Sequence, residues 1–133
     1  SMLSEAIFSI PAVKGIEFGS GFDFANMYGS EANDVWIIQD NKVITKTNHN
    51  GGINGGIANG MPITFKTVIK PTPSISLEQD SVNYETKENV KLSISGRHDP
   101  AIIHRARAVV DAMTALVIAD AYMMTYGRKW FEK

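Results

Sequence analysis

Residues 48–60 carry the clearest chemical signature of this chain, because five of its 11 glycines fall there among asparagines and isoleucines. Glycine is used where φ must be positive or where a ligand must approach the backbone closely. Consecutive glycines also expose backbone N–H groups that can bind an anion. A tight structural turn between strands would explain a single Gly-Gly pair, but this many glycines favour a surface shaped for ligand contact. The segment lacks the Gly-Lys-Ser/Thr of a P-loop and the Gly-x-Gly-x-x-Gly of a dinucleotide fold.

A second segment, Gly96-Arg97-His98-Asp99-Pro100, places a guanidinium, an imidazole and a carboxylate in succession. Its simplest interpretation is structural: Asp99 caps a helix that has Pro100 at its first position. Its functional interpretation is that Arg97 binds a phosphate or carboxylate through two parallel hydrogen bonds. Asp99 would then act as a base or as a tether for the ligand, and the helix dipole would favour its charge.

The third segment, Lys70-Pro71-Thr72-Pro73-Ser74, is rigid and offers one cation and two hydroxyl groups. It is either an extended connector or a loop that faces a phosphate or a cofactor. No pattern of this kind indicates a metal ion. The three histidines have no metal-ligand spacing, the carboxylates are not clustered and the chain has no cysteine, so we predict no metal site.

The elements that must position these segments include several short strands. Residues 63–69 alternate apolar and polar side chains, which is typical of a half-buried strand, and residues 13–18 alternate loosely and favour a strand. Residues 35–39 and 42–46 are rich in β-forming side chains, and Asp40-Asn41 between them suits a hairpin turn. Residues 29–33 are predicted to be a loop, and the charged residues 80–91 a solvated loop with a β-edge.

Helices are predicted at both ends of the chain. Residues 3–8 fit the last turns of one helix, which Pro11 should terminate. Apolar residues recur at helical spacing from about Pro100 to Tyr126, with Gly127 as the stop and basic residues after it. Strands and helices mix without a regular βαβ alternation, so the predicted fold class is α+β.

Composition limits the function further. The chain has 133 residues, 44% of them hydrophobic, which is enough for one domain with a single core. Its formal net charge of -1 gives no basic surplus for nucleic acid, and no run of 18 consecutive apolar residues indicates a membrane span. A chain without cysteine agrees with a cytoplasmic protein. Ser1-Met2 is expected to be a remnant that precedes a native segment starting near Leu3, which would make the chain a piece of a longer protein.

Taken together, these motifs resemble the chorismate synthase family, specifically the C-terminal third of that enzyme. The resemblance covers nearly the whole chain after Met2. Each motif alone is modestly specific, but four motifs in the correct order make coincidence improbable. The motifs are Ser9-Ile10-Pro11-Ala12-Val13-Lys14-Gly15-Ile16-Glu17, the glycine loop 51–60, Lys70-Pro71-Thr72 and Gly96-Arg97-His98-Asp99-Pro100, with Arg105-Ala106 and Asp111-Ala112-Met113 following at family-like spacing.

The resemblance implies a β-α-β sandwich fold and a cytoplasmic, homotetrameric parent enzyme. The family is a lyase of the shikimate pathway, in aromatic amino-acid biosynthesis. It converts 5-enolpyruvylshikimate-3-phosphate to chorismate by a 1,4-anti elimination of phosphate, and it requires reduced FMN although the reaction is redox-neutral overall. No nucleic acid or membrane partner is implied.

The resemblance also assigns roles residue by residue. Gly55 looks like a flavin contact, where a missing side chain lets the backbone approach the ring. Lys70, Pro71, Thr72, Pro73 and Ser74 match the family's flavin-binding loop. Arg97 looks like a contact shared by flavin and substrate, and Asp99 matches a carboxylate that assists proton movement near flavin N5. With these roles, the three segments are expected to form one wall of a flavin pocket.

Some residues depart from the family pattern. Pro73 replaces a small hydroxyl residue, and Arg107 stands where a valine is usual. The family's N-terminal region, with its two acid–base histidines and several substrate-binding arginines, has no counterpart here. We therefore expect residues 3–133 to form a single C-terminal domain that is inactive alone. The alternatives are a non-catalytic flavin-binding or oligomerisation module of shared ancestry, or an unrelated phosphate-binding domain.

Overall fold

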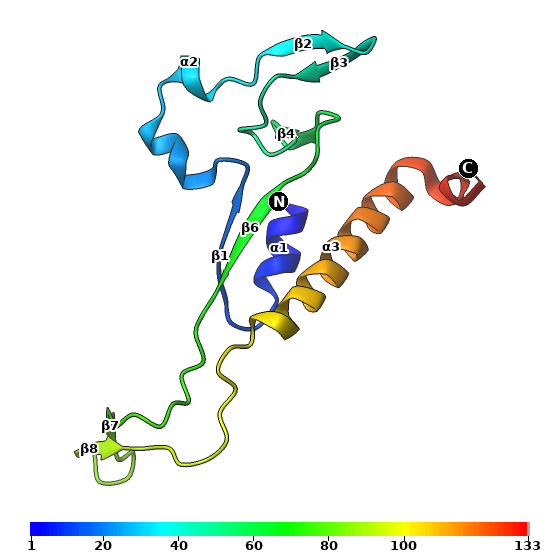
Figure 1. Cartoon of the computed structure of the whole chain (residues 1–133). Coiled ribbons are helices and arrows are strands. Elements are labelled where there is room, and N and C mark those ends of the chain that lie inside the picture. Colours follow the sequence, from blue (N-terminus) through cyan, green and yellow to red (C-terminus); the bar gives the residue numbers. More distant parts are fainter. Residues whose placement is uncertain (133) are drawn as a thin grey trace.

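The computed structural model describes residues 1–132, with side chains as far as Lys129. Helices and short antiparallel strands follow each other irregularly along the chain (Figure 1). In chain order the elements are α1 (Met2–Phe8), β1 (Val13–Phe18), the 3₁₀ helix η1 (Gly21–Asn26), α2 (Gly29–Ala32), β2 (Trp36–Gln39), β3 (Lys42–Thr45), β4 (Ile53–Asn54), β5 (Ile57–Ala58), β6 (Phe65–Ile69), β7 (Gln79–Val82), β8 (Asn89–Leu92), α3 (Ile103–Tyr126) and the 3₁₀ helix η2 (Gly127–Glu132). The predicted α+β class is confirmed.

A small core lies where α1 and α3 pack on the ribbon of β1 and β6 (Figure 1). Among the described residues only four hydrophobic side chains are buried, namely Leu3, Ile7, Ile10 and Val13. Around them pack half-buried side chains from the ribbon and from α3: Ile16, Phe65, Ile69, Val110 and Met113. This is little burial for a chain that is 44% hydrophobic, so much of its apolar surface remains exposed.

The ribbon joins two strands that are far apart in sequence. β1 and β6 run antiparallel, with Val13 opposite Ile69 and Phe18 opposite Phe65, and an irregularity in register between Val13 and Gly15. In β6 half-buried and exposed residues alternate, as the sequence predicts for a half-buried strand. The rings of Phe18 and Phe65 pack against each other with centroids 5.7 Å apart. Both predicted strands are therefore confirmed, although β6 begins two residues late, at Phe65.

The predicted hairpin is also confirmed. β2 pairs with β3 from Trp36 opposite Thr45 to Gln39 opposite Lys42. Asp40 and Asn41 form the turn with φ of 50° and 59°. Two successive positive φ values are typical of the type I′ turn, whose twist matches that of paired strands.

The loop predicted at residues 29–33 is wrong, because the chain forms one helical turn there, α2. Glu31 explains the difference. Its Oε2 accepts a hydrogen bond from the Tyr28 N–H at 2.9 Å, and its own N–H donates to the Tyr28 carbonyl at 2.9 Å. This reciprocal pairing satisfies groups that a helix start otherwise leaves unpaired. The charged segment predicted as a loop with a β-edge contains a hairpin of β7 and β8.

The long helix α3 begins later than predicted. Its first turn is closed by the N–H groups of Arg105 and Ala106, which both donate to the Ile102 carbonyl, so Ile102 and not Asp99 is the N-cap. The Asp99 carboxylate pairs with the Arg105 side chain instead of with backbone N–H groups, so it does not cap the helix. The predicted cap at Asp99 and first position at Pro100 are therefore wrong. The predicted stop at Gly127 is confirmed, with φ of 59°.

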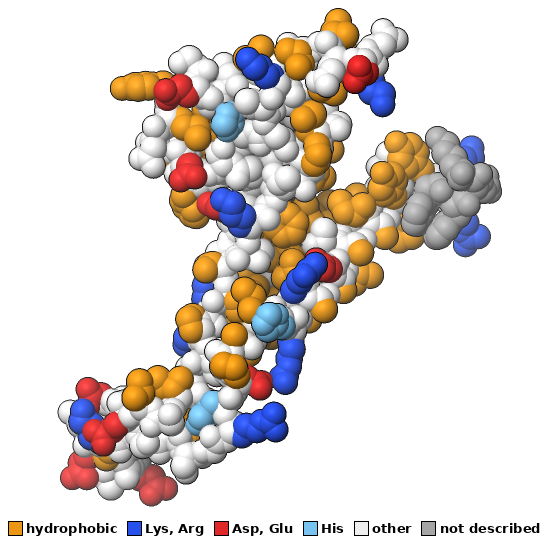
Figure 2. Space-filling view, viewed as in Figure 1, with side chains coloured by type: hydrophobic (Ala, Val, Ile, Leu, Met, Phe, Trp, Pro, Cys, Tyr) orange, Lys and Arg blue, Asp and Glu red, His pale blue; other side chains and the backbone are white. Residues whose placement is uncertain are grey.

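Hydrophobic side chains remain exposed along α3 (Figure 2). Leu116 and Met124 are each 64% exposed. An open groove lies on either side of the helix, one of about 540 Å³ beside Phe65 and one of about 420 Å³ beside α1. By length and composition, residues Ile103–Lys129 could also cross a membrane, and none of this stretch is buried in the chain. The described residues thus leave many apolar side chains of this helix uncovered.

Candidate functional site

A small pocket lies where β6 ends and α3 begins. Its volume is about 220 Å³, and it joins two segments that are distant in sequence. The lining residues are Ile69, Lys70, Pro71, Thr72, Pro100, Ala101, Ile102 and Ile103. The structure therefore brings the first half of segment 70–74 against Pro100, the last residue of segment 96–100.

Thr72 is the pocket residue whose hydroxyl lacks a hydrogen-bond partner among the described residues. This hydroxyl oxygen is buried. Most buried polar side-chain atoms have a partner, and leaving one without a partner costs about 1–3 kcal/mol. A bound molecule with an oxygen or nitrogen atom at this point would remove that cost.

Ala12 fixes the start of the same segment, and sequence reasoning gave it no role. Its carbonyl accepts a hydrogen bond from the Lys70 N–H at 2.7 Å. Its φ is 69°, a conformation that is uncommon for residues other than glycine. Strained backbone of this kind gathers at functional sites, so Ala12 joins the candidate residues. No sequence pattern predicts a positive φ at an alanine, so only the position of Ala12 in the motif of residues 9–17 could have drawn attention to it.

The Gly96-Arg97-His98-Asp99-Pro100 segment leads into α3, and of its residues only Pro100 lines the pocket. Asp99 Oδ2 lies 2.9 Å from Arg105 Nη1, and the Asp99 side chain is 47% exposed. The His98 ring is held at the Ile94 carbonyl, with Nε2 at 3.1 Å. Arg97 is exposed, and no carboxylate of the described part of the chain pairs with it. Its guanidinium is thus available to an anion, and the Asp99 carboxylate is held in place by a neighbouring cation.

The glycine segment has a buried base and an exposed tip. Gly51 and Gly52 are buried with φ of 61° and 78°, whereas Gly55 and Gly56 form the exposed turn between β4 and β5, with φ of 57° and 83°. A Cβ on Gly52 would lie 2.6 Å from the Pro62 carbonyl oxygen, so chain packing requires glycine there. A Cβ on Gly55 would meet no atom of the described residues within 4 Å. At the tip, then, the space beside the glycines is open to a ligand, as it also is beside Gly60 after the hairpin.

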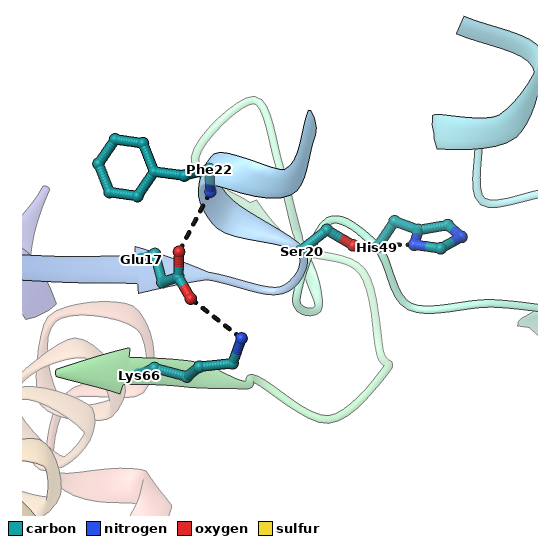
Figure 3. A network of polar contacts seen from close by, with 5 residues as sticks. All are labelled: Glu17, Ser20, Phe22, His49 and Lys66. Atoms are coloured by element: carbon teal, nitrogen blue, oxygen red, sulfur yellow. Dashed lines mark hydrogen bonds and ion pairs between the residues drawn. The ribbon is translucent and has the colours of Figure 1, made fainter. Parts of the chain in front are cut away.

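Ser20, just after β1, contacts His49 at the start of this segment, and Glu17 of β1 contacts Lys66 of β6 (Figure 3). Ser20 Oγ lies 2.9 Å from His49 Nδ1, and the Ser20 N–H donates to the His49 carbonyl at 2.8 Å. Glu17 accepts from Lys66 Nζ at 3.0 Å and from the Phe22 N–H at 3.1 Å. The hydrogen bond from Lys66, together with that from the Phe22 N–H, lowers the pKa of Glu17 below its ordinary value, although burial opposes the shift. The hydrogen bond with Glu17 also raises the pKa of Lys66.

The predicted site residues do not all meet within this chain. Gly55 lies in the β4–β5 hairpin at one end of β6, and Lys70 follows the other end (Figure 1). A strand of five residues spans about 17 Å, so the glycine hairpin and the pocket are separate surfaces here. Pro73 and Ser74 are exposed beyond the pocket. Within residues 1–132, no group of three or more histidines or carboxylates is arranged to hold a metal ion.

Comparisons with known proteins agree on one family. A family model described as chorismate synthase matches residues 1–123. A chorismate synthase of Dehalococcoides mccartyi is 52% identical over 118 residues, which cover 89% of this chain and 32% of that protein. One of Archaeoglobus fulgidus is 51% identical over 122 residues, covering 92% of this chain and 34% of that protein. This chain thus spans about a third of the length of the curated relatives it matches.

A solved structure gives the same result for the fold. A crystal structure of chorismate synthase matches with a TM-score of 0.70 and 30% sequence identity. The match covers 95% of this chain and 30% of that chain.

Proposed function

We propose, because this chain belongs to the chorismate synthase family, that it is the C-terminal part of such an enzyme and carries one side of its flavin and substrate site. The parent protein would be a lyase that forms chorismate from 5-enolpyruvylshikimate-3-phosphate in aromatic amino-acid biosynthesis. One observation carries the proposal: the pocket that joins Lys70, Pro71 and Thr72 to the start of α3 contains a buried hydroxyl that no described residue pairs with.

The pocket fits part of a flavin cofactor. Sites for ligands of this size usually measure about 300–1,000 Å³, so a pocket of about 220 Å³ would hold only a portion of FMN. The unpartnered hydroxyl of Thr72 suits the polar atoms of the cofactor. When bound, reduced FMN would lend electron density to the substrate as phosphate leaves.

The other residues of this chain would bind and orient the reactants. Lys70 and Arg97 supply cations for the phosphate groups, and Arg97 can form two parallel hydrogen bonds with an anion. Asp99 would accept or return a proton, and Arg105 would hold its carboxylate in position. Gly55 would let the backbone approach the flavin ring. Pro71, Pro73 and Ser74 would complete the loop that faces the cofactor.

The remaining two thirds of the enzyme would supply the rest of the site. The family's acid–base histidines and substrate-binding arginines have no counterpart in this sequence. We propose that residues 3–133 form one domain that packs through α3 on that missing part. We also propose that the parent enzyme is a cytoplasmic homotetramer, so that α3 is covered by protein and not by lipid.

Replacing Thr72 with valine in the full-length protein tests the proposal. Valine keeps the shape but not the hydroxyl, so the affinity for FMN should fall about fivefold, the equivalent of one hydrogen bond of about 1 kcal/mol. Thr72→Ser should bind FMN like the wild type. FMN fluorescence titration measures both. Thr125→Val is the matched control, because its hydroxyl bonds the Ala121 carbonyl within α3. Unchanged FMN affinity in Thr72→Val would contradict the proposed cofactor pocket.

A further inference from the structure

Asp34, which lies between α2 and β2, organises the start of the glycine segment. The residue is half-buried, and both of its carboxylate oxygens accept hydrogen bonds from residues 47–50. Oδ1 accepts from Thr47 Oγ1 and from the His49 N–H, each at 2.7 Å. Oδ2 accepts from the Asn50 N–H at 2.9 Å and from Asn50 Nδ2 at 3.0 Å. Four donors from one short stretch of chain thus converge on one carboxylate.

The same stretch, residues 47–50, leads into the base of the β4–β5 hairpin. Asn48 Oδ1 accepts from the Gly52 N–H at 2.8 Å, and Asn48 Nδ2 donates to the Pro62 carbonyl at 2.9 Å. Each strand of the hairpin has two residues, and space beside Gly55 and Gly56 at its tip is open. The contacts of residues 47–50, which lead into the hairpin, therefore set the direction of the tip. Asp34 supplies a charged acceptor for these contacts.

Asp34 is suited to hold a loop and unsuited to hold the ligand itself. Both oxygens are engaged, and a carboxylate would repel a phosphate group. Burial alone would raise the pKa of Asp34, but the hydrogen bonds from Asn50, Thr47 and His49 outweigh it and lower the pKa. Hydrogen bonds to an ionised acceptor are about twice as strong as those between neutral groups. The charge therefore strengthens all four contacts at neutral pH.

We propose that Asp34 is a positioning residue for the flavin site: its carboxylate fixes residues 47–50 and so aims the Gly55–Gly56 tip at the cofactor. The inference rests on the proposed function, because it requires Gly55 to meet the flavin. Asp34 acts through the loop and does not touch the cofactor.

Substitutions in the full-length protein separate this role from a general contribution to folding. Asp34→Asn puts an NH₂ group against N–H or O–H donors in either orientation of the amide, so FMN affinity should fall about tenfold. Asp34→Glu restores the charge and should recover part of that loss. Thr47→Val removes one of the four donors and should weaken FMN binding about threefold. Asp80→Asn is the control, because Asp80 pairs with Lys91 in the distant β7–β8 hairpin.

FMN affinity and thermal unfolding, measured on the same samples, decide the outcome. A purely structural role would lower the midpoint of unfolding and leave FMN affinity of the folded protein unchanged at low temperature. If Asp34→Asn or Thr47→Val lowers the midpoint but leaves FMN affinity unchanged, while Gly55→Ala weakens FMN binding, the inference is overturned and the proposed function still stands. If Gly55→Ala and Thr72→Val also bind FMN normally, the proposed function fails as well.

Discussion

At the scale of single residues, the glycines of this chain serve two different purposes. Gly19 and Gly51 allow two segments to touch: a Cβ on Gly19 would lie 1.9 Å from the His49 carbonyl oxygen and 2.4 Å from the Gly51 nitrogen. Both also have positive φ. Gly55 has a positive φ but open space beside it. Packing thus explains the first two, whereas Gly55 needs only its turn conformation unless a ligand approaches it.

Gly19→Ala should therefore destabilise the protein strongly. Left-handed strain and steric overlap together should cost about 2–5 kcal/mol. Gly29→Ala is the matched control, because a Cβ there meets nothing within 4 Å and α2 tolerates alanine; its effect should stay within about 0.5 kcal/mol. Thermal unfolding of the full-length variants measures both, and equal midpoints would contradict the close contact of residues 19 and 51.

Sequence reasoning identified the glycine segment but not what holds it. Five glycines in 13 residues indicate a shaped backbone, yet they do not say which of them packs against the chain and which faces outward. Gly52 is constrained by Pro62, and Asp34 receives donors from residues 47–50. Such long-range contacts leave no local pattern, because a lone aspartate before a strand looks like any solvated residue. The site roles of Arg97 and Asp99 remain predictions.

At the scale of elements, local patterns predicted the strands well and the helix starts less well. The β2–β3 hairpin follows from its β-forming residues and a two-residue turn. The start of α3 could not be predicted in this way, because Asp99 has the right residue type and position for an N-cap but pairs with Arg105. A capping signal competes with other side-chain partners, here Arg105 six residues further along, and the sequence does not show which interaction is stronger.

The β2–β3 turn offers a stabilising change. Asn41 has a φ of 59°, which glycine adopts without strain and asparagine only at some cost. Asn41→Gly gives the Asp-Gly pair that type I′ hairpins favour, so it should raise the stability by about 0.5–1 kcal/mol. Asn33→Gly is the control, because Asn33 has a φ of -67° and gains nothing from glycine. Thermal unfolding of both variants checks this; a lower midpoint for Asn41→Gly than for the wild type would refute it.

At the scale of the whole molecule, the chain belongs to the chorismate synthase family but spans about a third of its relatives' length. The family and the α+β class followed from ordered motifs and from the mixture of elements. The small size of the core did not follow, because 44% hydrophobic residues suggest more burial than four hydrophobic side chains. The helical spacing of apolar residues in α3 does not show which of them are covered: Val110 and Met113 pack half-buried on the core, whereas Leu116 and Met124 are exposed.

We expect the 133-residue chain alone to form no chorismate with reduced FMN, because half of the proposed site is missing. Its exposed α3 surface should bind a hydrophobic dye such as ANS and promote self-association. Co-expression with the rest of the parent enzyme as a separate chain should reduce dye binding and restore activity. Turnover by the 133-residue chain alone would refute the expected inactivity, and undiminished dye binding after co-expression would refute the proposed cover for α3.

The pairing of β1 with β6 has a consequence for how this chain folds. Val13 meets Ile69 only after the whole intervening segment has been brought back on itself. Closing so long a loop costs conformational entropy before any contact compensates it, and such non-local pairing slows folding. The β2–β3 and β4–β5 hairpins lie inside that loop and need only local contacts. The segment that presents the glycine tip can therefore order early, while the ribbon that supports the core is completed late.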